Sequence, residues 1–178
     1  MNSKKHVILT GMPGSGKSSV GFYLSKLMQR PFIDTDHYIS ARENKSITQI
    51  FSEYGEDCFR GMERQALLEI IENRPSVIST GGGMPCFYDN MDVMNKAAIT
   101  VYLETSPEKL FEYLKNDKKR PLVKDKTYEE LMDYINDSLI QRKPYYEKAD
   151  MRVRAHEKTS MQLAKELYET IEELRTKS

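Results

Sequence analysis

The chain is short of cysteine, of net charge and of long apolar runs, and each shortage excludes a class of protein. Its two cysteines, Cys58 and Cys86, are too few and too differently spaced for a zinc cluster, and we expect no disulfide. Because lysine plus arginine equals aspartate plus glutamate at 27 each, no overall field favours nucleic acid or a membrane surface. No run approaches the roughly 20 apolar residues that cross a bilayer, and the first residues do not resemble a secretory signal. We expect a cytoplasmic monomer that binds neither nucleic acid nor membranes.

What is present is a phosphate-binding loop. Residues 11–18 read Gly-Met-Pro-Gly-Ser-Gly-Lys-Ser and match G-x-x-x-x-G-K-[ST], between a predicted strand at 6–10 and a helical pattern. The glycines allow backbone N–H groups to turn toward phosphate oxygens, Lys17 would reach the outer phosphates, and Ser18 would offer its hydroxyl to Mg²⁺. A glycine-rich turn without a ligand is the alternative, which this context disfavours. We predict that a nucleoside triphosphate binds on Gly14, Ser15, Gly16, Lys17, Ser18 and Ser19.

Strands and helices are expected to alternate along the chain. Apolar runs predict strands at 6–10, 31–33, 76–80, 98–103 and 151–155. Helical patterns lie between them, and the last helix, at 159–174, has an apolar stripe of Leu163, Leu167, Ile171 and Leu174. This alternation predicts an α/β fold with a parallel sheet wound on both faces and ligands at the carboxyl ends of the strands. We expect one domain over residues 1–178.

Two aspartates follow the second predicted strand. Asp34 and Asp36 are two residues apart, so they point the same way if the chain stays extended. Phosphoryl transfer needs a metal site and a carboxylate that binds the acceptor hydroxyl, and the pair offers one carboxylate for each task. An exposed turn or a helix cap is the alternative.

Two further features favour a bound ligand over a plain surface. Arg60 and Glu63 lie three apart on a predicted helix, so Glu63 can hold the guanidinium, although a surface salt bridge is the default interpretation. Three glycines, Gly81, Gly82 and Gly83, follow a predicted strand at a cost in entropy. Close approach of a ligand to their N–H groups would explain them, and a tight turn is the alternative.

The connector at 116–126 is basic and has little apolar content. Within it, Arg120 precedes Pro121, which fixes the backbone beside a cation that could fold over the transferring phosphate. Closure of this segment would expel water and limit wasteful ATP hydrolysis. A solvated run of charge is the alternative.

In order and spacing these motifs resemble those of the shikimate kinase family, over residues 7 to about 153. The matching residues are the phosphate loop, Asp34-x-Asp36, Phe59-Arg60-x-x-Glu63, Gly81-Gly82-Gly83, Arg120-Pro121-Leu122, and Arg142 before Pro144-Tyr145-Tyr146. The resemblance implies a three-layer α/β sandwich around a central, mostly parallel five-stranded sheet, of the P-loop NTPase and nucleoside-monophosphate-kinase-like type. It also implies a substrate-binding subdomain at about 36–60 and a mobile lid at about 115–127.

The resemblance implies Mg²⁺-dependent transfer of the ATP γ-phosphate to the 3-hydroxyl of shikimate, a step toward chorismate and the aromatic amino acids. Arg60 and Arg142 would then pair with the shikimate carboxylate as planar forks. Glu63 would hold Arg60. Gly81, Gly82 and Gly83 would lie at the substrate, and the amides of Gly82 and Gly83 would donate to it. Asp36 would be the base or the group that orients the hydroxyl.

On the nucleotide side, the resemblance implies that Ser18 ligates Mg²⁺ directly and that Asp34 assists through water. Lys17 and Arg120 would act on the phosphates of ATP. Tyr113 stands where the family usually has an arginine against adenine, and its ring could stack on the base instead.

Three other functions begin with the same loop. A regulatory GTPase is disfavoured because neither Asp-x-x-Gly nor Asn-Lys-x-Asp occurs. A gluconate-type or nucleoside-monophosphate kinase shares the loop, lid and size, but would not need two arginines plus a triple glycine. A non-enzymatic nucleotide-binding protein is disfavoured by the retained Lys17, Ser18, both aspartates and Arg120.

Overall fold

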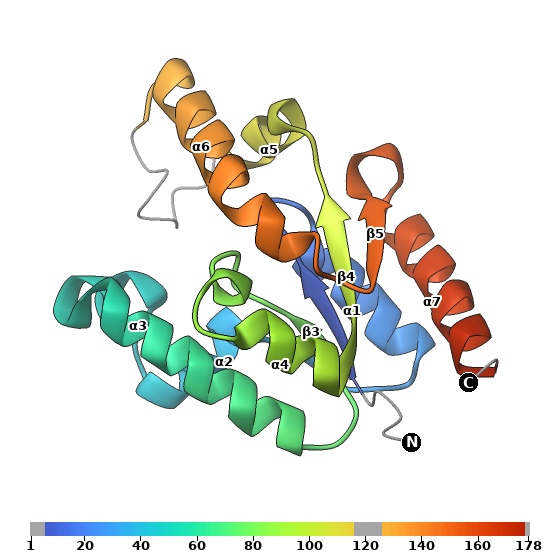
Figure 1. Cartoon of the computed structure of the whole chain (residues 1–178). Helices are drawn as coiled ribbons and strands as arrows, with labels where there is room; N and C mark the ends of the chain where they lie inside the picture. The colour runs from blue at the N-terminus through green and yellow to red at the C-terminus, as the bar shows by residue number, and fades with distance from the viewer. Residues whose placement is uncertain (1–5, 116–125, 177–178) are drawn as a thin grey trace.

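The computed structural model describes residues 6–115 and 126–176, except for the side chain of His156, and it confirms the predicted α/β fold (Figure 1). Five parallel strands form one sheet in the order β2-β3-β1-β4-β5. They are β1 (His6–Thr10), β2 (Phe32–Asp34), β3 (Val77–Ser79), β4 (Ala98–Glu104) and β5 (Met151–Arg154). Each strand predicted from the sequence is therefore present, within one residue of its expected ends.

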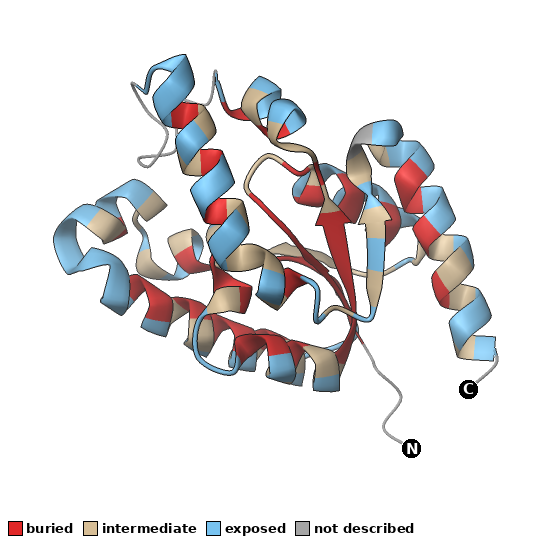
Figure 2. Ribbon diagram, turned by 45° about the horizontal axis from the view of Figure 1, so that its top comes forward, coloured by how far each residue is buried: buried red, intermediate tan, exposed pale blue. Residues whose placement is uncertain are grey.

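Helices cover both faces of the sheet, which gives the predicted three layers. On one face, α1 (Lys17–Leu27) and α7 (Ser160–Thr176) pack against Val7 and Leu9 of β1. On the other face, α3 (Ile47–Glu72) and α4 (Asn90–Ala97) pack against Ile8, because successive side chains of a strand point to opposite faces. Figure 2 shows this buried material in red along the strands and the inward sides of the helices.

Three more helices surround the carboxyl edge of the sheet: α2 (Thr35–Glu43), α5 (Pro107–Leu114) and α6 (Tyr128–Tyr146). Two short 3₁₀ turns, η1 (Met84–Cys86) and η2 (Ala155–Glu157), also lie in this region. A separate apolar cluster holds α5 and α6 in place, and its members are Met12, Tyr102, Leu110, Leu114, Leu131, Ile135 and Tyr146. Since Met12 belongs to the phosphate loop, this cluster fixes α6 relative to the predicted site.

Several helices begin at capping residues. Ser46 and Thr127 each form a capping box, and Ser106 caps α5 ahead of a proline. Gly55 has φ 77° and ψ 174°, so it divides the 47–72 segment into a short and a long helix. Of the apolar stripe predicted for α7, Leu163, Leu167 and Ile171 are buried, whereas Leu174 is 45% exposed. Among the described residues, no helix has the length and apolar content needed to cross a bilayer.

Candidate active site at the carboxyl edge of the sheet

The phosphate-binding loop runs from the end of β1 into α1, as predicted. Gly11, Gly14 and Gly16 have φ angles of 138°, 82° and 85°, a range that favours glycine. The buried ammonium of Lys17 donates to the carbonyl oxygens of Gly11, at 2.9 Å, and Met12, at 2.7 Å. Lys17 is also the first residue of α1, so the positive end of the helix lies at the loop. Backbone geometry, helix and ammonium together make an anion site.

A cavity of about 470 Å³ opens beside this loop. Among the described residues, all those predicted to bind nucleotide line it: Gly14, Ser15, Gly16, Lys17, Ser18, Ser19 and Tyr113. Asp36 and Gly82 also line the cavity, so it reaches from the loop to the predicted acceptor residues. Arg120, and with it most of the predicted lid at about 115–127, lies outside the described residues.

A third wall of the cavity was not predicted. It consists of Ala155, Lys158, Thr159 and Ser160, in the turn between β5 and α7. A usable signal existed, because this turn leaves the carboxyl end of the last strand, where ligands bind in parallel sheets. Sequence reasoning found no chemical motif in it and passed over it.

Ser18 and Asp34, the residues predicted to serve the metal, lie in direct contact. The Ser18 hydroxyl donates to Asp34 Oδ2 at 2.7 Å. The other oxygen, Asp34 Oδ1, accepts from the backbone N–H of Asp36 and of His37, at 3.1 and 3.2 Å. The expectation of an extended 34–36 segment was therefore wrong: β2 ends at Asp34, which caps α2. The helix starts there because the carboxylate satisfies two N–H groups of its first turn.

A hydroxyl and a carboxylate oxygen are hard donors of the kind that Mg²⁺ prefers, so Ser18 and Asp34 fit that ion. Within the described part of the chain, there is no cluster of three or more His, Cys, Asp or Glu side chains that could hold a metal ion. Mg²⁺ is commonly held by one or two protein groups together with phosphates and water, and this donor set matches that pattern.

Asp36 and Glu63 meet over Gly81. A Cβ on Gly81 would lie 2.6 Å from Asp36 Oδ1 and 2.8 Å from Glu63 Oε1, so a side chain there would collide with both carboxylates. The N–H of Gly81 donates to the buried Thr35 hydroxyl at 2.9 Å. Gly81 therefore supplies space for the two acids, and its own amide is used within the protein.

Glu63 is an unusual acid because it is almost fully buried. Burial raises the pKa of Glu63 to about 7, the Arg60 guanidinium opposes the rise, and the charge of Asp36 adds to it. Glu63 Oε1 has no hydrogen-bond partner among the described residues. A carboxyl group in this state titrates near neutral pH, a property that is concentrated at functional sites.

The ion pair between Arg60 and Glu63 is confirmed, and it is buried rather than on the surface. Arg60 Nη1 donates to Glu63 Oε2 at 2.6 Å, and the exposed fractions of the two residues are 5% and 1%. On another edge, Arg60 Nε and Nη2 donate to Glu56 Oε1 at 3.2 and 2.8 Å. A Cβ on Gly83 would lie 2.5 Å from Arg60 Nη1, so Gly83 is needed to admit the guanidinium. Glu56 was missed, although its i, i+4 spacing from Arg60 was a signal.

Helix α6 brings Arg142 to the same cluster. Burial raises the pKa of Cys86 to about 11, and the charges of Arg142 and Arg60 act against this rise. The positive charge of Arg142 also lowers the pKa of Glu63, so Arg142 interacts electrostatically with this buried acid. One turn further along α6, the Tyr146 hydroxyl donates to the Gly82 carbonyl at 2.6 Å, which ties this helix to the triple glycine.

The amides of Gly82 and Gly83 differ from that of Gly81. Neither N–H has a hydrogen-bond partner within the described residues. A Cβ on Gly82 would lie 2.6 Å from Pro13 Cδ, so this glycine lets the turn pack against the phosphate loop. The two amides are the ones that a ligand can use.

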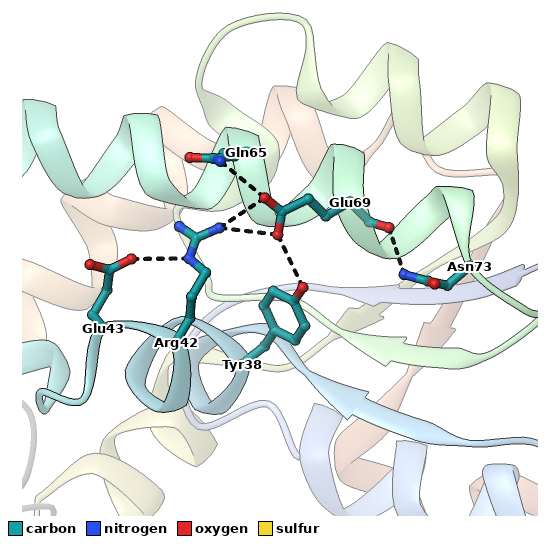
Figure 3. A network of polar contacts seen from close by, with 6 residues as sticks. All are labelled: Tyr38, Arg42, Glu43, Gln65, Glu69 and Asn73. Atoms are coloured by element: carbon teal, nitrogen blue, oxygen red, sulfur yellow. Dashed lines mark hydrogen bonds and ion pairs between the residues drawn. The ribbon is translucent and has the colours of Figure 1, made fainter.

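A polar network joins α2 to α3 at a distance from the cavity (Figure 3). From α2, the Tyr38 hydroxyl donates to Glu69 Oε2 at 3.0 Å, and Arg42 Nη1 donates to both Glu69 oxygens at 3.1 and 3.2 Å. From α3 itself, Gln65 Nε2 donates to Glu69 Oε1 at 3.0 Å. Because α2 carries Asp36 and α3 carries Arg60, the network helps to fix the spacing of the predicted acceptor residues.

Comparison with known proteins agrees with this geometry. A family model described as shikimate kinase matches residues 13–172. A curated shikimate kinase from Parabacteroides distasonis is 47% identical over 148 residues, which cover 83% of this chain and 86% of the relative.

Solved structures give the same result. A shikimate kinase from Bacteroides thetaiotaomicron superposes with a TM-score of 0.89 at 40% identity, over 94% of this chain and 98% of that one. A shikimate kinase from Acinetobacter baumannii, described as in complex with shikimate, superposes at 0.88 and 31% identity, over 96% and 94% of the two chains. A gluconokinase from Sinorhizobium meliloti reaches only 0.61 at 17% identity, over 100% and 99%, and shows the shared fold alone. With the family model spanning most of the sequence, the chain belongs to the shikimate kinase family.

Proposed function

We propose that this protein transfers the γ-phosphate of ATP to the 3-hydroxyl of shikimate, giving shikimate 3-phosphate and ADP on the way to chorismate and the aromatic amino acids. The observation that carries the proposal is the meeting of two sites at one edge of the sheet. The cavity beside the phosphate loop is also lined by Asp36 and Gly82, and Asp36 adjoins the buried Arg60–Glu63 pair across Gly81. Membership of the family supports this assignment, as does the relative described with shikimate bound.

On the nucleotide side, loop N–H groups and Lys17 bind the outer phosphates of ATP. Ser18 and Asp34 would hold Mg²⁺, and the resemblance implies that Asp34 would do so through water. When bound, the ion would neutralise charge on the phosphates. Tyr113 is 60% exposed and lines the cavity, so its ring is available to stack on adenine. Arg120 stays in the proposal as a phosphate-binding cation by resemblance alone.

On the acceptor side, Arg60 and Arg142 bind the shikimate carboxylate, and Glu63 holds Arg60 in its orientation. The amides of Gly82 and Gly83 are available to donate to the same substrate, while Gly81 keeps the approach to the acids open. Residues of about 36–60 would form the substrate-binding subdomain of a single domain.

Asp36 is the group that receives or orients the reacting hydroxyl. In the proposed step, the proton on O3 passes toward the Asp36 carboxylate as O3 forms its bond to the γ-phosphorus. The bond from that phosphorus to the bridging oxygen breaks, and ADP leaves with the electron pair. The protein contributes alignment, charge neutralisation and exclusion of water rather than covalent chemistry.

The first experiment is coupled ADP release with Mg²⁺-ATP, comparing shikimate with quinate, gluconate and nucleoside monophosphates at one concentration. Strong ADP release with shikimate, and with none of the other acceptors, supports the proposal. Turnover on gluconate or a nucleotide, with none on shikimate, would keep the kinase and discard the acceptor assignment of Arg60 and Arg142. A cytoplasmic, monomeric protein stays a prediction from the sequence, and gel filtration tests the second part.

A further inference from the structure

Phe87 follows the η1 turn and contacts the candidate acceptor site, yet nothing in the proposed reaction uses it. Its ring centroid lies 4.3 Å from Cζ of Arg60, the distance of a close cation–π contact. Phe87 is 37% exposed, so it is not part of the apolar core. Sequence reasoning gave this residue no role, because no motif contains it.

The Arg60 guanidinium is held at its edges by two carboxylates of unequal strength. Glu63 is buried and accepts from Nη1, whereas the side chain of Glu56, which accepts from Nε and Nη2, is 55% exposed. An exposed ion pair is screened by water and salt and constrains its partner weakly. Two rings lie against the guanidinium itself: the Phe59 centroid is 5.4 Å from Cζ of Arg60, and the Phe87 centroid, at 4.3 Å, is the closer of the two. A ring against one face limits how far the plane can tilt.

We propose that Phe87 is a positioning residue that holds the plane of Arg60 and thereby sets the affinity for the carboxylate of the acceptor. The inference rests on the proposed function, in which Arg60 binds that carboxylate. Two-pronged recognition of a carboxylate requires a fixed guanidinium plane, and a plane that tilts freely loses one of its two hydrogen bonds. The ring also shields the pair from water, which strengthens its electrostatics.

The test compares Phe87→Leu with Phe87→Tyr and with a matched control, Phe22→Leu. Phe22 is 48% exposed and lies under the ammonium of Lys26 at 5.2 Å, but it belongs to α1 and does not contact Arg60. We expect Phe87→Leu to raise the shikimate KM about 5- to 20-fold, with kcat and the ATP KM changed less than about twofold. Phe87→Tyr keeps the ring and should restore the wild-type KM. Phe22→Leu should change none of these constants.

A double-mutant cycle separates positioning from a general structural effect. In an Arg60→Lys background there is no guanidinium plane to hold, so Phe87→Leu should change the shikimate KM by less than about twofold. An equal fold-change in both backgrounds would overturn the proposal, and so would a loss of kcat, ATP affinity and melting temperature together. The methyl ester of shikimate gives a second readout, because without the carboxylate wild type and Phe87→Leu should behave alike.

The outcomes distinguish this inference from the proposed function. If the wild-type protein releases no ADP with shikimate, the proposed function fails. If wild type is active and Phe87→Leu matches Phe22→Leu, the acceptor assignment stands and the role of Phe87 is rejected.

Discussion

The nucleotide half and the acceptor half of the site are built in different ways. The phosphate-binding part of the nucleotide half is one continuous segment, 11–18, whose shape comes from glycines with positive φ and which contains its own cation, Lys17. The acceptor half is assembled from α2, α3, the triple glycine and α6, and it depends on side chains that crowd one another. The nucleotide half depends on the backbone conformation of a single loop, whereas the acceptor half depends on tertiary packing. Substitutions should therefore affect the two halves differently.

The largest expected effect is on the acceptor half, at Asp36. Asp36→Asn removes the carboxylate proposed to take the hydroxyl proton, and kcat should fall by about 10²- to 10⁴-fold with much smaller changes in either KM. Removing a negative charge beside buried Glu63 should not destabilise the fold, so the loss would be chemical. Steady-state kinetics checks this, with the exposed Asp57→Asn on α3 as a control. An unchanged kcat would reject Asp36 as the base.

Gly81→Ala and Gly16→Ala test the two kinds of glycine directly. At Gly81 the new Cβ would displace Asp36 and Glu63, so kcat/KM for shikimate should fall about 100-fold while the ATP KM changes little. At Gly16 no atom lies within 4 Å, but φ is 85°, so alanine should cost about 1–2 kcal/mol and weaken ATP binding. Gly61→Ala, in open space on α3, is the neutral control. If Gly16→Ala lowered kcat/KM for shikimate and Gly81→Ala did not, the distinction between the two kinds of glycine would be wrong.

The sequence predicted the nucleotide half better than the acceptor half. The phosphate loop and the positions of the five strands depend on neighbouring residues, so local patterns were enough. The Arg60–Glu63 contact was also local, but its burial was not, because α6 and the triple glycine cover it from distant parts of the chain. No local sequence pattern indicated a role for Thr35 or Phe87. Each contacts a residue more than twenty positions away, Gly81 and Arg60 respectively. The extended Asp34–Asp36 segment failed because a capping carboxylate starts a helix there.

Because Glu63 is buried in the acceptor half, its ionisation at high pH should lower the free energy of unfolding of the protein. Its pKa is about 7 in the folded chain and 4.5 as the ordinary value, so the folded state binds the proton more tightly. The stabilisation that comes from protonated Glu63 is fully present below about pH 4.5 and is lost as the pH rises through 7. The free energy of unfolding falls by about 3 kcal/mol at most over this range. Urea unfolding of wild type and Glu63→Gln at pH 5 and pH 8 measures the difference, and the exposed Glu72→Gln corrects for net charge. A wild-type advantage that grows with pH would contradict the sign.

The smallest expected effect tests whether the acceptor half also depends on the remote network between α2 and α3. Glu69→Gln removes the charge that Arg42 and Tyr38 contact, and the shikimate KM should rise about two- to fivefold because Asp36 and Arg60 are held less firmly. The ATP KM should not move, since α1 and the loop do not touch this network. Glu72→Gln, one turn along α3, carries the same charge change without these contacts.

Salt gives an independent check on the same point. Glu69 is partly exposed, so about 0.5 M salt should weaken the network in wild type and raise the shikimate KM, with a smaller change in Glu69→Gln. If both proteins respond equally, apolar packing of Ile39 against α3 is sufficient to position Asp36. The acceptor half would then resemble the nucleotide half in needing only its immediate neighbours. A response confined to wild type would show that its geometry is set by charges well outside the cavity.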